Sequence, residues 1–167
     1  MAISHSDEWI FHGTVTKMLE DFVKQFSRTP IQYKKINDSF FLVNNRLEDH
    51  RIHDKTPIIL GCYLGKIKKN TFFPSFNLLD ILSDFTKEKI VVNTRGEIDF
   101  LYGKHIRKRH VLSIKGSKDK QTLKLVQNCH DENLGYGLFI GLSDDRAQVL
   151  RHILDRGVFI KRDKYQR

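Results

Sequence analysis

The most informative stretch of this chain is Phe100-Leu101-Tyr102-Gly103-Lys104-His105-Ile106-Arg107-Lys108-Arg109. It joins an apolar and aromatic segment to a glycine, and a dense group of cations follows the glycine. A glycine after an apolar helical segment suits the end of a helix, where a positive φ is needed that other residues adopt only with strain. The stretch therefore predicts a rigid turn, anchored in a hydrophobic core, that displays positive charge at the surface.

The positive charge of the chain is concentrated in its C-terminal half. The 167 residues carry a formal net charge of +9. Residues 102–124 contain eight Lys and Arg residues and one acid, and residues 151–167 contain six and two. Such a patch is typical of a protein with a polyanionic partner, most often nucleic acid. The alternative is a basic protein whose lysines and arginines are merely solvated.

Length and composition indicate an ordinary folded protein of one domain or two small ones. No run approaches the roughly 18–20 apolar residues that a membrane helix needs, and the N-terminus lacks the pattern of a signal peptide. Cys62 and Cys129 lie far apart in sequence, which favours a reducing compartment over a disulfide framework. We therefore expect a monomer without membrane association, cytoplasmic or, in a eukaryote, nucleolar.

The first part of the chain predicts a mixed α/β domain over residues 1–85. Thr29-Pro30 ends a run with helical spacing, because the residue before a proline is disfavoured in the α region. Ser75 suits the N-cap of a second helix. The expected elements are a helix over Thr14–Phe26, strands over Ile31–Ile36 and Phe40–Val43, a buried strand over Ile58–Gly65, and a helix with Leu78, Leu79, Leu82 and Phe85 on one face.

The remainder, residues 86–167, predicts a small β-barrel, because short strands alternate with glycine-rich turns. We place the boundary near residue 86, without a flexible linker, and expect the two domains to pack against each other. The expected elements are a strand over Lys89–Val92, a turn at Thr94–Gly96, a helix over Glu97–Tyr102, strands over Leu123–Val126 and Leu138–Leu142 around a turn at Asp131–Gly137, and a final strand over Gly157–Ile160.

The segment from Phe100 to Ile106 closely resembles the Phe-Leu-Tyr-Gly-Asn-His-Val signature of the Nip-seven family of ribosome-biogenesis factors. Three further stretches resemble segments of that family in the same order and spacing: Leu60–Lys66, Leu134–Gly137 and Gly157–Lys161. The resemblance covers residues 58–164 and is weak over residues 1–57. Three positions depart from the family pattern, where Lys104 replaces Asn, Val158 replaces Glu and Lys161 replaces Arg. The richness in Lys and Ile favours an archaeal member.

This resemblance implies an α+β protein, with an N-terminal mixed α/β domain packed against a C-terminal PUA-type small β-barrel. It implies a non-catalytic RNA-binding factor of large-subunit biogenesis and pre-rRNA processing, which contacts other assembly proteins through its N-terminal domain and needs no cofactor. By family analogy the PUA fold presents RNA to its first helix, the adjoining loop and the last strand. The RNA-binding residues expected there are Lys104, His105, Arg107, Lys108, Arg109, Lys161, Arg162 and Lys164.

Two other functions stay open from the sequence. One is a protein-interaction adaptor whose basic patch meets acidic partners and touches RNA incidentally. The other is an accessory subunit of an RNA-modifying enzyme.

Catalytic and metal-binding patterns are weak in this chain. Asp49–Asp54 and Cys129-His130-Asp131 gather reactive side chains but read better as polar loops than as a metal site or a nucleophilic triad. Tyr102 and Tyr136 suit base stacking, although packing in the core is the better interpretation. We therefore expect no catalytic residues and no metal.

Overall fold

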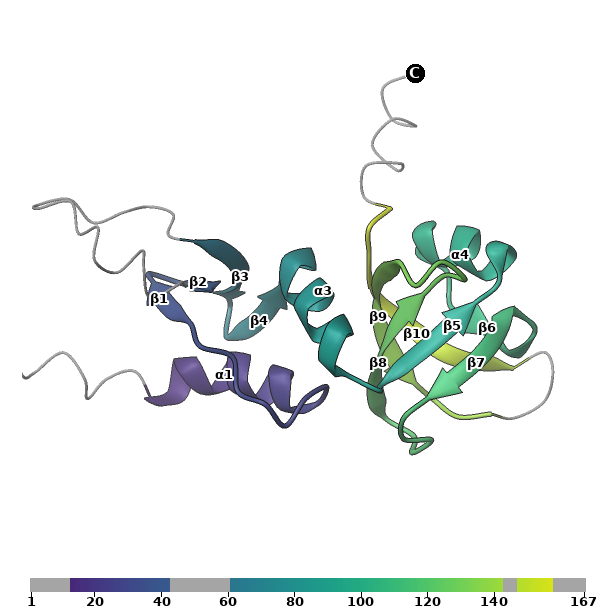
Figure 1. Cartoon of the computed structure of the whole chain (residues 1–167), viewed down its shortest axis with the longest axis horizontal. Coiled ribbons are helices and arrows are strands. Elements are labelled where there is room, and N and C mark those ends of the chain that lie inside the picture. The colour runs from purple at the N-terminus through teal and green to yellow at the C-terminus, as the bar shows by residue number, and fades with distance from the viewer. Residues whose placement is uncertain (1–12, 43–60, 143–146, 158–167) are drawn as a thin grey trace, which may run out of the picture. The chain divides into compact units, whose positions relative to one another are not determined.

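The computed structural model describes residues 13–42, 61–142 and 147–157 of the chain (Figure 1). The chain forms two compact units, Met1–Leu78 and Leu79–Arg167, and the division falls within the helix α3 (Phe76–Phe85). The predicted domain boundary near residue 86 stays a prediction. The predicted strand at Gly157–Ile160 lies outside the described residues apart from its glycine, as does the Asp49–Asp54 cluster.

The N-terminal unit pairs one helix with an antiparallel sheet. Helix α1 spans Gly13–Lys24, and its unit contains the strands β1 (Lys34–Ile36), β2 (Ser39–Leu42), β3 (Cys62–Lys68) and β4 (Thr71–Pro74), in that order in the sheet. Leu19, Phe22 and Val23 are buried, and the Phe22 ring lies 5.5 Å from that of Phe72. The predicted first helix and hairpin are thus confirmed, although β1 starts later than the predicted strand and β2 starts one residue earlier.

Helix α3 begins at the predicted cap. The Ser75 hydroxyl accepts a hydrogen bond from the Leu78 N–H at 3.1 Å, which satisfies one of the unpaired amides of the first turn. Leu78, Leu79 and Leu82 are fully buried. Phe85, which the spacing placed on the same face, is 66% exposed because it lies at the last position of the helix.

The C-terminal unit is a curled six-stranded sheet with the order β6-β10-β9-β8-β5-β7, in which every pair is antiparallel except β5 with β8 (Figure 1). A helix, α4, contacts β5, β6, β9 and β10. The elements are β5 (Lys89–Val92), α4 (Thr94–Leu101), β6 (Ile106–Arg107), the 3-10 turn η1 (Lys108–His110), β7 (Val111–Lys115), β8 (Thr122–Gln127), β9 (Asn133–Phe139) and β10 (Gln148–Asp155). The core consists of Ile90, Val92, Phe100, Ile106, Val126, Leu134, Phe139, Val149 and Leu150.

In this unit the predicted turn at Thr94–Gly96 is wrong, and only the start of the predicted turn at Asp131–Gly137 lies outside a strand. Thr94–Gly96 forms the first turn of α4 because the Asn93 side chain caps the helix, accepting from the Gly96 N–H at 2.9 Å. Leu134–Gly137 lies within β9, and its glycines serve close strand pairing instead of a turn. A Cβ at Gly135 would lie 2.0 Å from the carbonyl oxygen of Leu154 in β10. The predicted strand at Leu138–Leu142 correspondingly starts earlier and ends at Phe139.

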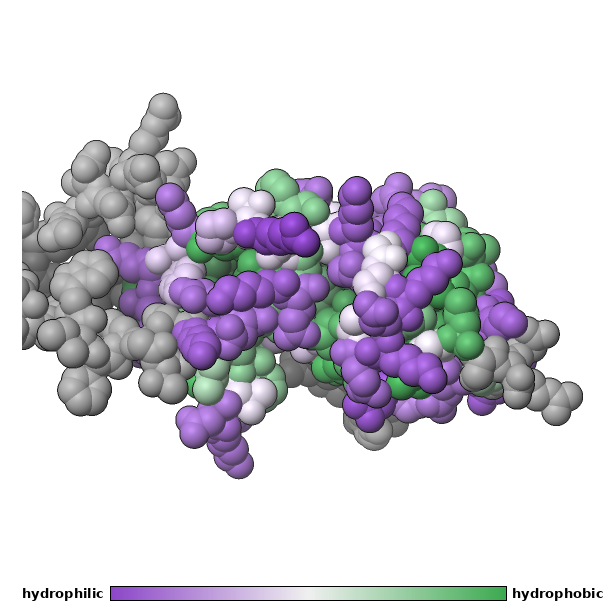
Figure 2. All heavy atoms as spheres, turned by 90° about the horizontal axis from the view of Figure 1, so that it is seen from below, coloured by the Kyte–Doolittle hydropathy of each residue, from purple (hydrophilic) through white to green (hydrophobic). Residues whose placement is uncertain are grey.

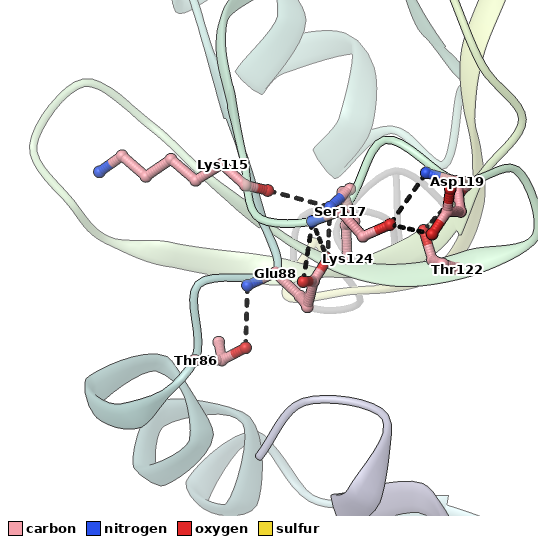
Figure 3. Close-up of polar contacts among 7 residues, drawn as sticks. All are labelled: Thr86, Glu88, Lys115, Ser117, Asp119, Thr122 and Lys124. Carbon is pink, nitrogen blue, oxygen red and sulfur yellow. Dashed lines mark hydrogen bonds and ion pairs between the residues drawn. The ribbon is translucent and has the colours of Figure 1, made fainter. Parts of the chain in front are cut away.

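A buried ion pair connects β8 to the residue before β5 and to the loop between β7 and β8 (Figure 3). Lys124 is fully buried, and its Nζ donates to Glu88 Oε2 at 2.5 Å and to the Lys115 carbonyl oxygen at 2.9 Å. The same ammonium lies 5.7 Å from the centre of the Phe139 ring. Glu88 also accepts from the Ser117 N–H at 2.9 Å, so the pair fixes the start of a lysine-bearing loop.

Hydrophilic side chains cover much of the face drawn in Figure 2, with hydrophobic groups between them. Among the described residues, no helix is long and apolar enough to cross a membrane.

Candidate nucleic-acid interface

The turn after α4 has the conformation that its glycine predicts. Gly103 has a φ of 79°, and its N–H donates to the Phe100 carbonyl at 2.8 Å. The Lys104 N–H donates to the Asp99 carbonyl at 2.9 Å. Phe100 is fully buried, so the aromatic half of the stretch anchors the helix while the chain beyond Gly103 leaves it at a fixed angle.

The chain then forms β6, which is an edge strand of the six-stranded sheet. Ile106 is fully buried, and Arg107 pairs with Gln148 of β10. Because neighbouring strand residues point to opposite faces, the inward Ile106 leaves Arg107 exposed. His105 is also exposed, and its Nδ1 accepts from the His152 N–H at 3.1 Å. Sheet pairing therefore positions the first cation of the Arg-Lys-Arg run.

The run continues as the 3-10 turn η1, in which Lys108 and Arg109 are exposed and His110 is buried. The Lys108 N–H donates to the Ala147 carbonyl at 3.3 Å. The Asn93 side chain donates to the Arg109 carbonyl at 3.0 Å. The N-cap residue of α4 therefore also holds η1 against the helix.

Asp99 is a buried carboxylate beneath these cations. Its Oδ1 accepts from Lys104 Nζ at 3.0 Å, and its Oδ2 lies 4.0 Å from Arg95 Nε and 3.6 Å from His110 Nε2. The hydrogen bond from Lys104 lowers the pKa of Asp99 despite burial, and the charges of Lys104 and Arg95 act in the same direction. The carboxylate is therefore ionised at neutral pH and neutralises part of the positive charge around it.

His110 is held as a neutral imidazole. Burial lowers its pKa, the charges of Arg109, Arg107 and Arg95 lower it further, and Asp99 opposes them. The Arg107 N–H lies 3.4 Å from Nδ1, and Arg109 Nε lies 3.2 Å from Nε2. A neutral ring has a single acceptor nitrogen, so only one of these contacts is a hydrogen bond at a time.

These elements surround a hollow of about 430 Å³, which we call the basic hollow. It is lined by Arg95, Asp99, Gly103, Lys104, His105, Arg107, Arg109 and Gln148. The structure thus brings together Lys104, His105, Arg107 and Arg109 of the predicted RNA-binding residues. Lys108 is exposed beside them without lining the hollow, while Lys161, Arg162 and Lys164 lie outside the described residues.

Sequence reasoning missed three residues of the basic hollow. Asp99 lies in the predicted helix over Glu97–Tyr102 but was given no role there. Arg95 was assigned to a turn, although its spacing of four from Asp99 is that of an ion pair along a helix. Gln148 reaches the hollow only because β10 pairs with β6, and nothing in its local sequence indicates that.

The weaker candidate sites gain nothing from the structure. Cys129 and His130 are exposed in a turn whose backbone is held by Asn128, which accepts from the His130 N–H at 2.9 Å. Within the described ranges, no group of His, Cys, Asp and Glu residues is suited to a metal. Tyr136 is buried, which raises its pKa to about 12, and this confirms core packing for that residue; Tyr102 is 41% exposed.

Residues 88–164 match the family described as the UPF0113 PUA domain. The chain is 34% identical over 80 residues to the 60S ribosome subunit biogenesis protein nip7 of Schizosaccharomyces pombe, covering 47% of this chain and 44% of that protein. It is 32% identical over 111 residues to the NIP7 homolog of Danio rerio, covering 62% of each chain. The Saccharomyces cerevisiae NIP7 is 34% identical over 80 residues, covering 47% of this chain and 44% of that protein. The match thus spans less than two thirds of each of these relatives.

Solved structures resemble the fold over most of its length. A conserved PUA domain protein from Thermoplasma acidophilum superposes with a TM-score of 0.55 at 15% identity, covering 88% of this chain and 94% of that chain. A hypothetical protein from Pyrococcus horikoshii gives a TM-score of 0.51 at 13% identity, covering 85% and 89%. At these identities the likeness concerns the fold alone, and it confirms an α+β protein with a PUA-type C-terminal unit.

Proposed function

We propose that this chain is a non-catalytic RNA-binding factor of large ribosomal subunit biogenesis, because residues 88–164 match the UPF0113 PUA domain and the chain is similar to the Nip7 proteins. The names of its relatives support the biogenesis role. The observation that supports the RNA contact is the basic hollow. Its four cations come from α4, the turn after α4, β6 and η1, and its one carboxylate, Asp99, pairs with Lys104.

The interface consists of the residues expected from the family resemblance, with the cations of the basic hollow at its centre. Because their backbone is fixed by Gly103, by β6 and by η1, these cations bind phosphates at a small cost in conformational entropy. The C-terminal cations belong to the set because the family resemblance assigns RNA contacts to the last strand. The proposed set is Lys104, His105, Arg107, Lys108, Arg109, Lys161, Arg162 and Lys164.

The N-terminal part has a different role in this proposal. Residues 1–85 form a domain that docks other ribosome-assembly proteins, and residues 86–167 form the RNA-binding domain. The protein acts as a monomer, in the cytoplasm of an archaeon or in the nucleolus of a eukaryote.

The test is RNA binding by fluorescence anisotropy, with single-stranded and duplex RNA at several salt concentrations. The double variant Arg107→Glu/Lys161→Glu is expected to lose binding while keeping its circular dichroism spectrum. The matched control Lys17→Glu/Lys68→Glu changes two exposed cations of the N-terminal unit by the same charge and is expected to bind normally. In the unmodified protein, log affinity should fall with log salt by about 0.7 per phosphate contact on a single strand.

Three results would count against the proposal. Unchanged affinity in the Arg107→Glu/Lys161→Glu variant would refute this RNA face. A salt slope near zero would refute phosphate contacts in general. Tight binding of an acidic protein with no RNA binding would favour an adaptor.

A further inference from the structure

The basic hollow has more positive charge than its own residues neutralise. Four cationic side chains and a single carboxylate line it, which leaves a formal charge of +3. The carboxylate of Asp99 already accepts from Lys104 and lies near Arg95 and His110. Among the described residues, neither Arg107 nor Arg109 has an ion pair with a carboxylate. Within the described part of the chain, the guanidinium groups of Arg107 and Arg109 therefore have no carboxylate acceptor, and an anion would supply one.

The backbone of the two arginines is held from several directions. Arg107 pairs with Gln148 across the sheet, and its N–H faces the buried His110 at 3.4 Å. The Arg109 carbonyl accepts from Asn93 at 3.0 Å, and Arg109 Nε lies 3.2 Å from His110 Nε2. Among the described residues, no acceptor contacts the terminal nitrogens of Arg109, so these nitrogens can bind a ligand. A guanidinium held in this way presents a planar fork that matches two oxygens of one phosphate.

We infer that the basic hollow binds the terminal phosphate of an RNA strand. This inference rests on the proposed RNA-binding function and specifies which part of the RNA the hollow binds. A terminal phosphate monoester carries about −1.5 to −2 charges at pH 7 and has three strong acceptor oxygens. A phosphodiester within the strand carries one charge and has two such oxygens. Because Coulomb attraction grows with the product of the charges, a site with a charge of +3 favours the monoester.

The volume of the hollow and the amide of Gln148 suit the last nucleotide of an RNA strand. Its volume of about 430 Å³ lies within the range of about 300–1,000 Å³ that is typical of small-ligand sites, so it accommodates more than a phosphate group. Gln148 contributes an amide that both donates and accepts hydrogen bonds, which suits the ribose or base of the last nucleotide. His105 lies at the same lining and adds a further polar ring.

The experiment compares RNA oligonucleotides of one sequence that differ only at one end. Two carry a 5′-phosphate or a 5′-hydroxyl with the fluorophore at the 3′ end, and two carry a 3′-phosphate or a 3′-hydroxyl with the fluorophore at the 5′ end. Anisotropy titrations are expected to show about tenfold tighter binding for one phosphorylated end than for its hydroxyl counterpart, the gain expected from one or two charge-assisted hydrogen bonds. The pair that shows the difference identifies whether the site reads the 5′ or the 3′ end.

Substitutions in the basic hollow test whether this site causes the preference for a phosphorylated end. Arg109→Gln and Arg107→Gln are expected to abolish it, and Arg109→Lys to reduce it, because lysine keeps the charge and loses the fork. Both arginines are exposed, so these substitutions leave the core unchanged. Lys118→Gln removes an exposed cation of the same unit that does not line the hollow, and it is expected to keep the full preference.

The outcomes separate this inference from the proposed function. Equal affinity for all four oligonucleotides would overturn the terminal-phosphate inference and leave RNA binding standing. Absence of binding to every oligonucleotide would overturn both. A preference that persists in Arg107→Gln and Arg109→Gln would overturn the assignment to this hollow. A phosphopeptide that competes as well as phosphorylated RNA would overturn its restriction to RNA ends.

Discussion

Replacing Glu88 by glutamine is expected to destabilise the C-terminal unit by about 3 kcal/mol, because the fully buried Lys124 then has no counter-charge. Glutamine has nearly the size of glutamate and keeps an oxygen that accepts from the Ser117 N–H, so the substitution removes charge and little else (Figure 3). The lysine retains its hydrogen bond to the Lys115 carbonyl and its position over the Phe139 ring, neither of which carries a full negative charge.

The opposite substitution, Lys124→Met, is expected to cost less, about 1–2 kcal/mol. It removes the buried ammonium itself, and the remaining Glu88 side chain is 22% exposed, so water hydrates its charge in part. The main losses are the ion pair and one hydrogen bond to the Lys115 carbonyl, the latter worth about 1 kcal/mol. The double variant should cost less than the sum of the single variants, because the two side chains are in direct contact.

Urea unfolding followed by circular dichroism measures these free energies. By thermal unfolding, a loss of about 3 kcal/mol in a unit of this size corresponds to a melting temperature lower by about 12–24 °C. Lys118→Met, at an exposed position of the neighbouring loop, is the control and should stay within about 0.5 kcal/mol of the parent. The reasoning is refuted if Lys124→Met costs more than Glu88→Gln, or if Glu88→Gln costs less than about 1 kcal/mol.

Three further predictions concern the support beneath the basic hollow. Stability should fall as the pH drops below about 7, because the unfolded chain takes up a proton near the ordinary histidine pKa of about 6.5, whereas burial lowers the pKa of His110 in the fold. Urea titrations at a series of pH values should show the fall, with a flatter profile in His110→Asn. The lowered pKa of Asp99 adds a second loss only below about pH 4. Gly96→Ala should destabilise the C-terminal unit by about 1–3 kcal/mol in thermal melts, although alanine has the better helix propensity. The new Cβ would lie 2.8 Å from His110 Cβ and 3.0 Å from Val92 Cβ. A gain in stability would contradict this prediction. Asn93→Ala should cost about 1 kcal/mol in the same melts through loss of the helix cap, and an unchanged midpoint would count against the capping role.

Much of the local structure was predictable because local rules govern it. The glycine at position 103 predicted a helix end, and its φ of 79° confirms that role. Ser75 predicted a helix start, and its hydrogen bond to the Leu78 N–H confirms it. The resemblance to the Nip-seven family is confirmed by the match of residues 88–164 to the UPF0113 PUA domain and by the similarity to the Nip7 proteins.

The predictions that failed depended on neighbours distant in sequence. A glycine pair such as Gly135 and Gly137 is typical of a turn when only the adjacent residues are considered. In the fold these glycines are strand residues, because the backbone of β10 approaches them too closely for a side chain. Arg95 was likewise assigned to a turn, since a glycine follows it directly, and the cap at Asn93 makes the segment helical.

The sequence by itself determined the class of fold, the resemblance to the Nip-seven family and the concentration of positive charge, because hydrophobic periodicity, motif order and charge are all properties of the linear chain. Tertiary structure alone decided which cations share a site. Arg95 comes from a helix and Gln148 from a strand more than fifty residues later, and only the pairing of β10 with β6 brings Gln148 beside Arg107. Tertiary structure also placed Lys104 at hydrogen-bonding distance from the Asp99 carboxylate. The charge of this buried carboxylate is therefore retained and is neutralised by the lysine. Such geometry depends on strand register and on the exclusion of water, and neither is encoded at any single position of the chain.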